Sequence, residues 1–246
     1  LQYHERAEES PELDDLAREI FKELEKGNRE YRLLWKKFRD MSIKEFDAIY
    51  KRLGVKFDLI TGEGAFVKEA HAAIDDCLRK KWCRVSEGGV VVAEFPELPS
   101  FLLRKQDGST LYLTRDLVSI QWRVKKYRPD LLLYVVGSEQ SLNFQQLFRL
   151  AHELGYLGRA EARHIAFGLV LKGGEKMSTR KGTGVELEEL LSEAVRKAVA
   201  IIKKKNPRLP ATTVKRVGEI VGVGAMIYNA LRSSRGRSAR AIACAS

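Results

Sequence analysis

The sequence predicts an α/β fold that contains a parallel sheet. Two apolar runs, Leu131–Val136 and Ile165–Leu171, are continuous and read as strands covered on both faces. A helical pattern that stops at Gly155 lies between them. A strand, a helix and a second strand in this order predict parallel pairing through a right-handed crossover.

Composition indicates a globular protein with a surplus of positive charge. The 246 residues are 44% hydrophobic and 31% charged, and Lys and Arg exceed Asp and Glu to give a net charge of +11. That charge suits a polyanionic partner without identifying one. Length allows one large domain or parts of two.

The cysteines and the apolar segments indicate in which cellular compartment the protein is expected. Cys77, Cys83 and Cys244 form no CxxC pair and no even disulfide framework, which is typical of a reducing cytosol. No apolar run approaches the ~18 residues that span a bilayer. No spacing typical of a metal site occurs, so we expect neither a membrane segment nor a protein-bound metal.

Three helical patterns begin the chain. The first follows Ser10-Pro11-Glu12, an N-cap with a proline and an acid in the first turn, and ends at Gly27. The second contains Trp35 and Phe38. The third starts at Ser42 with a capping box and ends at Gly54. Periodicity favours a packed helical layer, although the aromatic residues could also form a nucleic-acid-binding face.

The middle of the chain mixes strands with a helix. Alternation predicts a short strand over Val55–Leu59, a helix follows from about Ala65 to Trp82, and Val90–Phe95 is a second strand. Asp107-Gly108 then predicts a hairpin whose strands are Phe101–Lys105 and Thr110–Thr114. A further helix starts near Asp116.

Helices are also predicted after the second apolar run. One long pattern ends at Lys203–Lys205, and Pro207 and Pro210 mark a linker. A second pattern covers Val214–Leu231. The last stretch, Arg232–Ser246, has no apolar stripe and is predicted to be a disordered basic tail.

A basic loop is the first candidate site. Lys176-Met177-Ser178-Thr179-Arg180-Lys181-Gly182 follows a strand and a glycine-containing link, and a helix comes next. Fixed cations neutralise phosphate charge, while hydroxyl and backbone N–H groups donate hydrogen bonds. The loop therefore suits a polyphosphate. A solvated surface loop is the alternative.

The second candidate site combines a phenol, a carboxylate and an amide. Tyr112 and Asp116 can both look into a crevice if a strand gives way to a helix there, and a carboxylate is the natural partner of a guanidinium. Gln140 follows the first apolar strand and adds a neutral amide. Ligands of parallel sheets bind beyond the carboxyl ends of the strands, so Gln140 and the basic loop should face one crevice. A helix-capping Asp116 beside a core Tyr112 is the alternative.

Four ordered motifs resemble one family. The basic loop is similar to the KMSKS signature of class I aminoacyl-tRNA synthetases, and its Thr179-Arg180 pair looks like the arginyl-tRNA synthetase variant. Tyr112–Asp116, Val135–Gln140 and His164–Leu171 precede it in the order seen in arginyl-tRNA synthetases. The resemblance covers residue 1 to about Leu231.

The resemblance implies roles for individual residues. Tyr112, Asp116 and Gln140 would bind the arginine substrate. Lys176 would be the cation beside pyrophosphate, with Ser178 and Arg180 or Lys181 assisting. The implied nucleotide contacts are His164, Gly168, Val170, Leu171, Lys176, Met177 and Ser178. ATP would bring its own Mg²⁺ without a dedicated protein site.

The resemblance also implies a function and a domain order. The chain would belong to an arginine–tRNA ligase whose partners are tRNA(Arg), L-arginine and ATP, cytoplasmic and monomeric at full length. Residues 1–99 would be a connective insertion. Residues 100–206 would be the second half of a Rossmann-like catalytic domain. Residues 207–246 would begin the helical anticodon-binding domain and end in a divergent basic tail.

Two departures qualify these expectations. The family's Gln-x-x-His-Phe reads Gln140-Ser141-Leu142-Asn143-Phe144, so Asn143 replaces the histidine. The HIGH signature is absent, which implies an internal fragment that is inactive alone. A non-catalytic RNA-binding module derived from a synthetase is therefore the alternative function.

Overall fold

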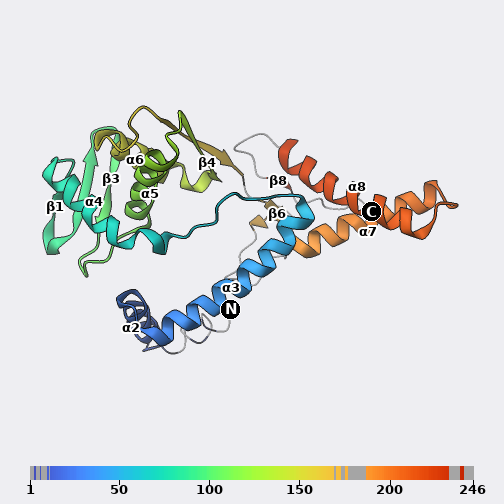
Figure 1. The fold of residues 1–246 in the computed structure, drawn as a ribbon, viewed down its shortest axis with the longest axis horizontal. Helices are drawn as coiled ribbons and strands as arrows, with labels where there is room; N and C mark the ends of the chain where they lie inside the picture. Colours follow the sequence, from blue (N-terminus) through green and yellow to red (C-terminus); the bar gives the residue numbers. More distant parts are fainter. Residues whose placement is uncertain are drawn as a thin grey trace. The chain divides into compact units, whose positions relative to one another are not determined.

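The fold is described by a computed structural model over residues 12–168, 170–172, 175–176, 187–232 and 239–240, together with Tyr3, Arg6 and Ser10. The chain divides into two compact units (Figure 1). Residues 59–168 form the first. The described residues up to Asp58 and from Val170 onward form the second. No helix in these ranges is long and apolar enough to cross a membrane.

The unit of residues 59–168 begins with a helix and a small antiparallel sheet. The 3-10 turn η1 (Glu63–Phe66) leads into α4 (Val67–Arg79), close to the predicted helix. Three strands follow in the order β1-β2-β3, namely β1 (Cys83–Val85), β2 (Val91–Phe95) and β3 (Leu98–Arg104). The 3-10 turn η2 (Glu87–Gly89) connects β1 to β2.

The predicted hairpin of Phe101–Lys105 and Thr110–Thr114 has its first strand in β3, but its second strand does not form. A turn forms as expected, since the backbone N of Lys105 donates to the carbonyl of Ser109 over 2.9 Å. However, Thr110 makes only an isolated bridge with Arg104, and helix α5 (Tyr112–Tyr127) begins two residues later. Leu113, Leu117 and Ile120 recur at helical spacing and are buried, so burying the helix face overrides strand alternation.

The parallel sheet is confirmed. β4 (Leu131–Gly137) and β5 (Glu161–Phe167) pair in parallel from Leu131↔Glu161 to Gly137↔Phe167. The crossover contains the 3-10 turn η3 (Ser138–Gln140) and α6 (Ser141–Glu153), which is followed by Gly155 at φ +73°.

Only one face of this sheet is covered among the described residues, contrary to the prediction. Leu132, Tyr134 and Val136 pack against the core beneath α5 and α6. Leu133 and Val135 alternate with them and are 56% and 64% exposed. The apolar run is continuous, but a single helical layer covers a single face.

The largest fully buried side chains of this unit come from four elements. They are Ile74, Leu103, Leu117, Ile120, Leu147 and Leu150. Cys77 and Cys83 lie in the same cluster as free, buried thiols. A hydrogen bond with Cys83, together with burial, raises the pKa of the Cys77 thiol.

The other unit opens with two helices. α2 (Glu12–Lys26) ends at Gly27, whose φ is +99°. α3 (Arg29–Leu53) is capped by Asn28, whose side-chain oxygen accepts from the N–H of Glu30 over 3.0 Å.

The predicted break at Ser42 is wrong, because α3 continues through it. Neither Gly nor Pro interrupts Arg29–Leu53, so the Ser42 capping box has no helix end to cap. The predicted packed layer is also wrong for this helix. Across α3, which the structure describes completely, no residue is buried.

The segment after α3 forms no strand, although Val55–Leu59 was predicted to be one and lies wholly within the described range. Gly54 ends the helix at φ +70°, and the Val55 N–H donates to the Tyr50 carbonyl over 2.8 Å. Phe57 then packs edge-to-face on Tyr50, with ring centroids 4.8 Å apart. This local aromatic contact replaces strand pairing.

Three short strands belong to the same unit, in the order β7-β6-β8. β6 (Val170–Lys172) pairs with β7 (Glu175–Lys176) and with β8 (Ala239–Arg240). The predicted run Ile165–Leu171 is thus divided between β5 and β6. Ala239–Arg240 is paired rather than disordered. The rest of the tail after Arg232 lies outside the described residues.

Two long helices complete this unit, as predicted. α7 (Leu187–Lys205) and α8 (Ala211–Arg232) pack against each other. Gly218 and Gly222 permit the close approach. A Cβ at Gly222 would lie 2.6 Å from Cα and 2.7 Å from N of Val195.

Arg52 ties α3 to this helix pair. Its guanidinium donates to Glu219 of α8 over 2.7 Å, to Glu188 of α7 over 2.6 Å and to Ser192 of α7 over 3.1 Å. The hydrogen bond with Glu219 raises the pKa of Arg52. One half-buried cation therefore joins three helices that are far apart in sequence.

We expect Gly222→Ala to destabilise the α7–α8 pair. The added methyl meets Val195 backbone atoms, which cannot rotate away, so the free energy of unfolding should fall by about 1–3 kcal/mol. Gly224→Ala is the matched control, because nothing lies within 4 Å of its Cβ position. That exposed helical site should gain about 0.5–1 kcal/mol. Urea unfolding measures both, and equal effects would contradict close packing at Gly222.

Candidate active site

A pocket of about 700 Å³ lies within the unit of residues 59–168. It is formed where β3, the first turns of α5 and α6, and β4 come together. Its lining residues are Phe101, Leu102, Leu111, Tyr112, Leu113, Asp116, Arg123, Tyr134, Val136, Gln140, Asn143, Phe144 and Gln146. The three residues expected to bind an amino acid, Tyr112, Asp116 and Gln140, are all among them.

The first turn of α5 presents two of these residues together. Tyr112 and Asp116 are four positions apart in a helix, so their side chains project on one face. Tyr112 is exposed, and the Arg115 guanidinium lies 5.9 Å from its ring centroid. Asp116 is half-buried. The carboxylate can accept two parallel hydrogen bonds from a planar cation, and the phenol can pack beside that cation's stem.

A buried hydrogen bond fixes where α5 starts. The hydroxyl of Thr114 donates to the carbonyl oxygen of Leu103 in β3 over 2.7 Å, and Thr114 is fully buried. The N–H of Leu111 approaches the same carbonyl at 3.5 Å. These contacts lock the end of β3 to the first turn of the helix, and thereby set the direction of Tyr112 and Asp116.

Several pocket residues were not predicted from the sequence, among them the polar pair Arg123 and Tyr134. Arg123 donates through one nitrogen to the hydroxyls of Ser119 and Tyr134, each over 2.9 Å, and its guanidinium lies 5.3 Å from the Tyr134 ring centroid. Burial raises the pKa of Tyr134, so its phenol stays protonated. Arg123 lies two turns after Asp116 on the same helix face, and that spacing was the only available signal.

Two neutral amides from η3 and α6 also line the pocket. Gln140 ends η3, directly after β4, and Asn143 lies in the first turn of α6. Ser141 steadies this corner by donating to the carbonyl of Ser138 over 2.6 Å. Asn143, which replaces the histidine of the family pattern, lines the pocket. It provides hydrogen-bonding groups there without a titratable proton.

His164 lies on β5 in a packed position. Its Nε2 is 3.0 Å from the carbonyl oxygen of Val136, and its ring stacks on Phe144 at 4.6 Å between centroids. These contacts fix the ring between β4 and α6. Gly168, one residue beyond β5, is the next residue of the expected nucleotide border. A nucleotide contact by either residue stays a prediction.

The basic loop falls mostly outside the description. Lys176 lies in β7 and Val170 and Leu171 in β6, where the strand pairing is described. Met177, Ser178, Arg180 and Lys181 lie outside the described residues. The expectation that this loop and the pocket share one crevice therefore stays a prediction.

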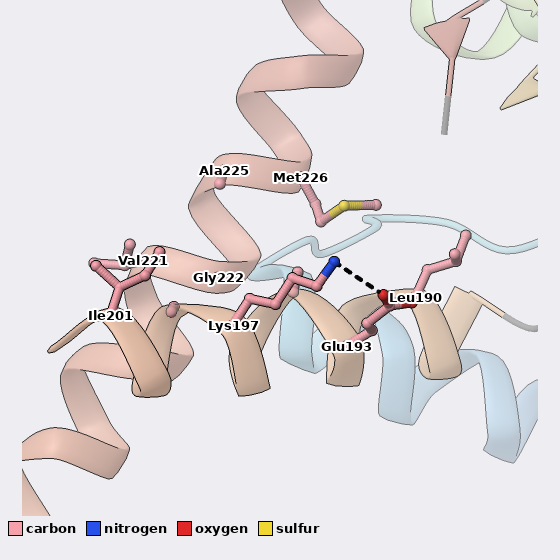
Figure 2. Close-up of a pocket in the computed structure, with 10 residues that line it drawn as sticks. Leu190, Glu193, Lys197, Ile201, Val221, Gly222, Ala225 and Met226 are labelled. Atoms are coloured by element: carbon pink, nitrogen blue, oxygen red, sulfur yellow. Dashed lines mark ion pairs between the residues drawn. The ribbon is translucent and has the colours of Figure 1, made fainter. Parts of the chain in front are cut away.

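A smaller pocket of about 220 Å³ lies between α7 and α8 (Figure 2). Its walls include Leu190, Ile201, Val221 and Met226, and Figure 2 shows the ion pair between Lys197 and Glu193, 3.2 Å apart, on the α7 side. Because its walls are mostly apolar and the charge of Lys197 is paired with Glu193, this pocket resembles a gap in helix packing more than a catalytic site. The 700 Å³ pocket is the stronger candidate site.

The described residues offer no metal centre. Among the residues that the structure describes, no group of three or more His, Cys, Asp or Glu side chains lies close enough together to hold a metal ion.

Comparison with known families assigns the chain. Residues 2–238 match the family of class I (R) tRNA synthetases, catalytic domain. The chain belongs to this family. The resemblance drawn from the four motifs is confirmed.

Individual relatives agree. The chain is 45% identical over 237 residues to the arginine–tRNA ligase of Exiguobacterium sp. and 46% identical over 237 residues to that of Enterococcus faecalis. Each match covers 96% of this chain and 42% of the relative. The chain thus spans less than half the length of these curated relatives.

A solved structure supports the fold. The crystal structure of arginyl-tRNA synthetase from Plasmodium falciparum matches with a TM-score of 0.79 at 20% identity. The match covers 94% of this synthetase-family chain and 39% of the other. The mixed α/β class with a parallel sheet is therefore confirmed.

We expect Thr114→Val to loosen the start of α5. Valine preserves the shape but leaves the Leu103 carbonyl without its short hydrogen bond, which should cost about 1–3 kcal/mol of unfolding free energy. Thr212→Val at the exposed start of α8 is the control and should stay within about 0.5 kcal/mol. Chemical denaturation measures both, and faster amide exchange at the start of α5 should accompany the loss.

Proposed function

We propose that this chain is part of an arginine–tRNA ligase. The single observation that carries the proposal is the pocket that unites Tyr112, Asp116 and Gln140. The 45–46% identity to arginine–tRNA ligases supports it. The reaction would activate arginine with ATP to arginyl-adenylate and pyrophosphate, and would then transfer arginine to the terminal adenosine of tRNA(Arg).

The pocket would recognise the arginine side chain. Asp116 would accept two hydrogen bonds from the substrate guanidinium, and Tyr112 would pack against its stem. Gln140, which lines the same pocket, would add a further hydrogen bond. Arg123, held by Tyr134 and Ser119, places a fixed positive charge on the same helix face as Asp116. Repulsion from Arg123 would keep the substrate cation at Asp116.

Positioning and charge stabilisation would carry the rate. The arginine carboxylate attacks the α-phosphorus, and negative charge grows on the departing pyrophosphate. Lys176 would neutralise that charge, assisted by Ser178 and by Arg180 or Lys181. Met177, His164, Gly168, Val170 and Leu171 would border the nucleotide. ATP would bring Mg²⁺ bound to its phosphates.

The domain order follows from the same family. We assign residues 1–99 to a connective insertion and residues 100–206 to the second half of a Rossmann-like catalytic domain. Residues 207–246 would start the anticodon-binding domain. The parallel pair β4–β5 with its α6 crossover supports the second assignment. We also propose a cytoplasmic protein that is monomeric at full length.

A second function is a non-catalytic RNA-binding module. The net charge of +11 favours it, because it suits a polyanionic partner. Two assays separate the functions. The ligase predicts arginine-dependent ATP–pyrophosphate exchange by the full-length gene product in the presence of tRNA. The module predicts tRNA binding without exchange.

We expect Asp116→Asn to raise the arginine KM of the full-length protein. Loss of a charge-assisted pair should cost about 1.5–3 kcal/mol, or roughly 10- to 150-fold in KM. The ATP KM should change little. Asp75→Asn, which removes the same charge from an exposed position on α4, is the control. An arginine KM unchanged in Asp116→Asn would contradict the assignment.

We expect Lys176→Ala to lower the exchange rate rather than weaken arginine binding. A cation that acts on developing charge contributes mostly to the transition state, so kcat should fall about 10²-fold with a small change in arginine KM. Lys68→Ala, at an exposed position on α4, should leave both unchanged. Equal losses in kcat and in arginine affinity would place Lys176 away from the phosphates.

A further inference from the structure

The 700 Å³ pocket carries opposite charges along α5. Asp116 and Arg123 both line it, and Arg123 comes seven positions later in the same helix. Their Cα atoms are therefore about 10 Å apart along the helix axis. Helical side chains lean toward the N-terminus, so the long side chain of Arg123 shortens this gap. An extended arginine molecule spans roughly 7 Å from its guanidinium carbon to its carboxylate carbon, which suits a pocket with an acidic and a basic end.

The basic end of the pocket has no counter-ion. Nη1 of Arg123 donates to the hydroxyls of Ser119 and Tyr134, and both acceptors are neutral. Among the residues that the structure describes, no carboxylate pairs with Arg123, and its Nε and Nη2 have no acceptor. Arg123 is also half-buried, so water solvates it only in part. A partly desolvated cation without a counter-ion is unfavourable, and an anionic group of a ligand would remove that cost.

The hydrogen-bond directions leave a second donor for a ligand. The Ser119 hydroxyl accepts from Arg123 and uses its own proton on the carbonyl oxygen of Asp116, over 2.8 Å. The Tyr134 hydroxyl also accepts from Arg123, but its own proton has no acceptor among the described residues. Burial raises the pKa of Tyr134, so the phenol keeps that proton. A hydroxyl that accepts from a cation is polarised and becomes a stronger donor.

We propose that Arg123 and Tyr134 bind the α-carboxylate of the arginine whose guanidinium is held by Asp116. The carboxylate is the group of arginine that accepts hydrogen bonds, since guanidinium and ammonium groups only donate. Tyr134 would donate through its hydroxyl, and Arg123 through its free N–H groups. One carboxylate oxygen held there leaves the other for the attack on ATP. The inference rests on the proposed function and adds two specificity-determining residues to its pocket.

Agmatine, which is arginine without its carboxylate, isolates the proposed contact. Isothermal titration of the full-length protein measures the Kd of both ligands, and the wild type should bind arginine more tightly. Tyr134→Phe should weaken arginine roughly tenfold and change agmatine by less than about twofold. Arg123→Met keeps the length of the stem and removes the charge, so it should weaken arginine roughly tenfold or more without weakening agmatine. Asp116→Asn should weaken both ligands, because both carry the guanidinium.

The ratio of the agmatine Kd to the arginine Kd protects the test from folding artefacts, because a damaged pocket weakens both ligands. Tyr134→Phe also keeps the ring that packs on Phe144 and Phe148, with centroids 5.3 Å apart in each pair. Tyr127→Phe, which removes a hydroxyl from the exposed end of α5, is the matched control and should change each Kd by less than about twofold. A ratio that stays at its wild-type value in either pocket variant would overturn the proposal.

Failure of the inference and failure of the proposed function remain distinguishable. If the wild type charges tRNA with arginine while the ratio is unchanged in a pocket variant, only the carboxylate contact is wrong. If both variants lower the ratio while the wild type charges no tRNA, the contact is supported and only the ligase assignment is wrong. If the wild type binds neither ligand, the arginine pocket is wrong and the inference falls with it.

Discussion

The candidate pocket depends on the junction between β3 and α5. Thr114 donates a buried hydrogen bond to Leu103, and this contact decides that the chain turns into a helix at Tyr112 instead of continuing as a second hairpin strand. As a strand, the segment would place Tyr112 and Asp116 on one face but more than 13 Å apart along the chain. In the helix they are one turn apart, about 6 Å, which is close enough to bind one guanidinium together.

The same junction shows what local patterns can predict. The runs Leu131–Val136 and Ile165–Leu171 predicted the parallel pair correctly, because their apolar character and the intervening helix admit few topologies. The prediction of a strand over Thr110–Thr114 was wrong. A five-residue segment fits a strand or the start of a helix equally well, and tertiary contacts decide which of the two forms. The prediction of a helix start at Ser42 was wrong for a related reason, because a capping-box sequence marks a helix end only where the helix is interrupted.

The pocket residues also divide into those that belong to short sequence motifs and those that are brought together only by packing. Tyr112, Asp116 and Gln140 could be named from the sequence because they belong to short motifs, and the structure places all three on one pocket. Arg123 and Tyr134 belong to no motif and are joined across α5 and β4 by a hydrogen bond. Such a pair is defined only by packing. The basic loop shows the opposite case, with a strong motif whose central residues lie outside the described structure.

Periodicity predicted helical structure across Arg29–Leu53, although as two helices rather than one, and did not predict how exposed this segment is. An amphipathic stripe normally implies burial, yet Arg32–Asp40 is solvated on every side and carries cations next to its aromatic rings. Covering that stripe with an apolar surface would leave Arg32 and Lys36, which have no ion-pair partner among the described residues, in a dry environment at a desolvation cost of several kcal/mol per unpaired charge.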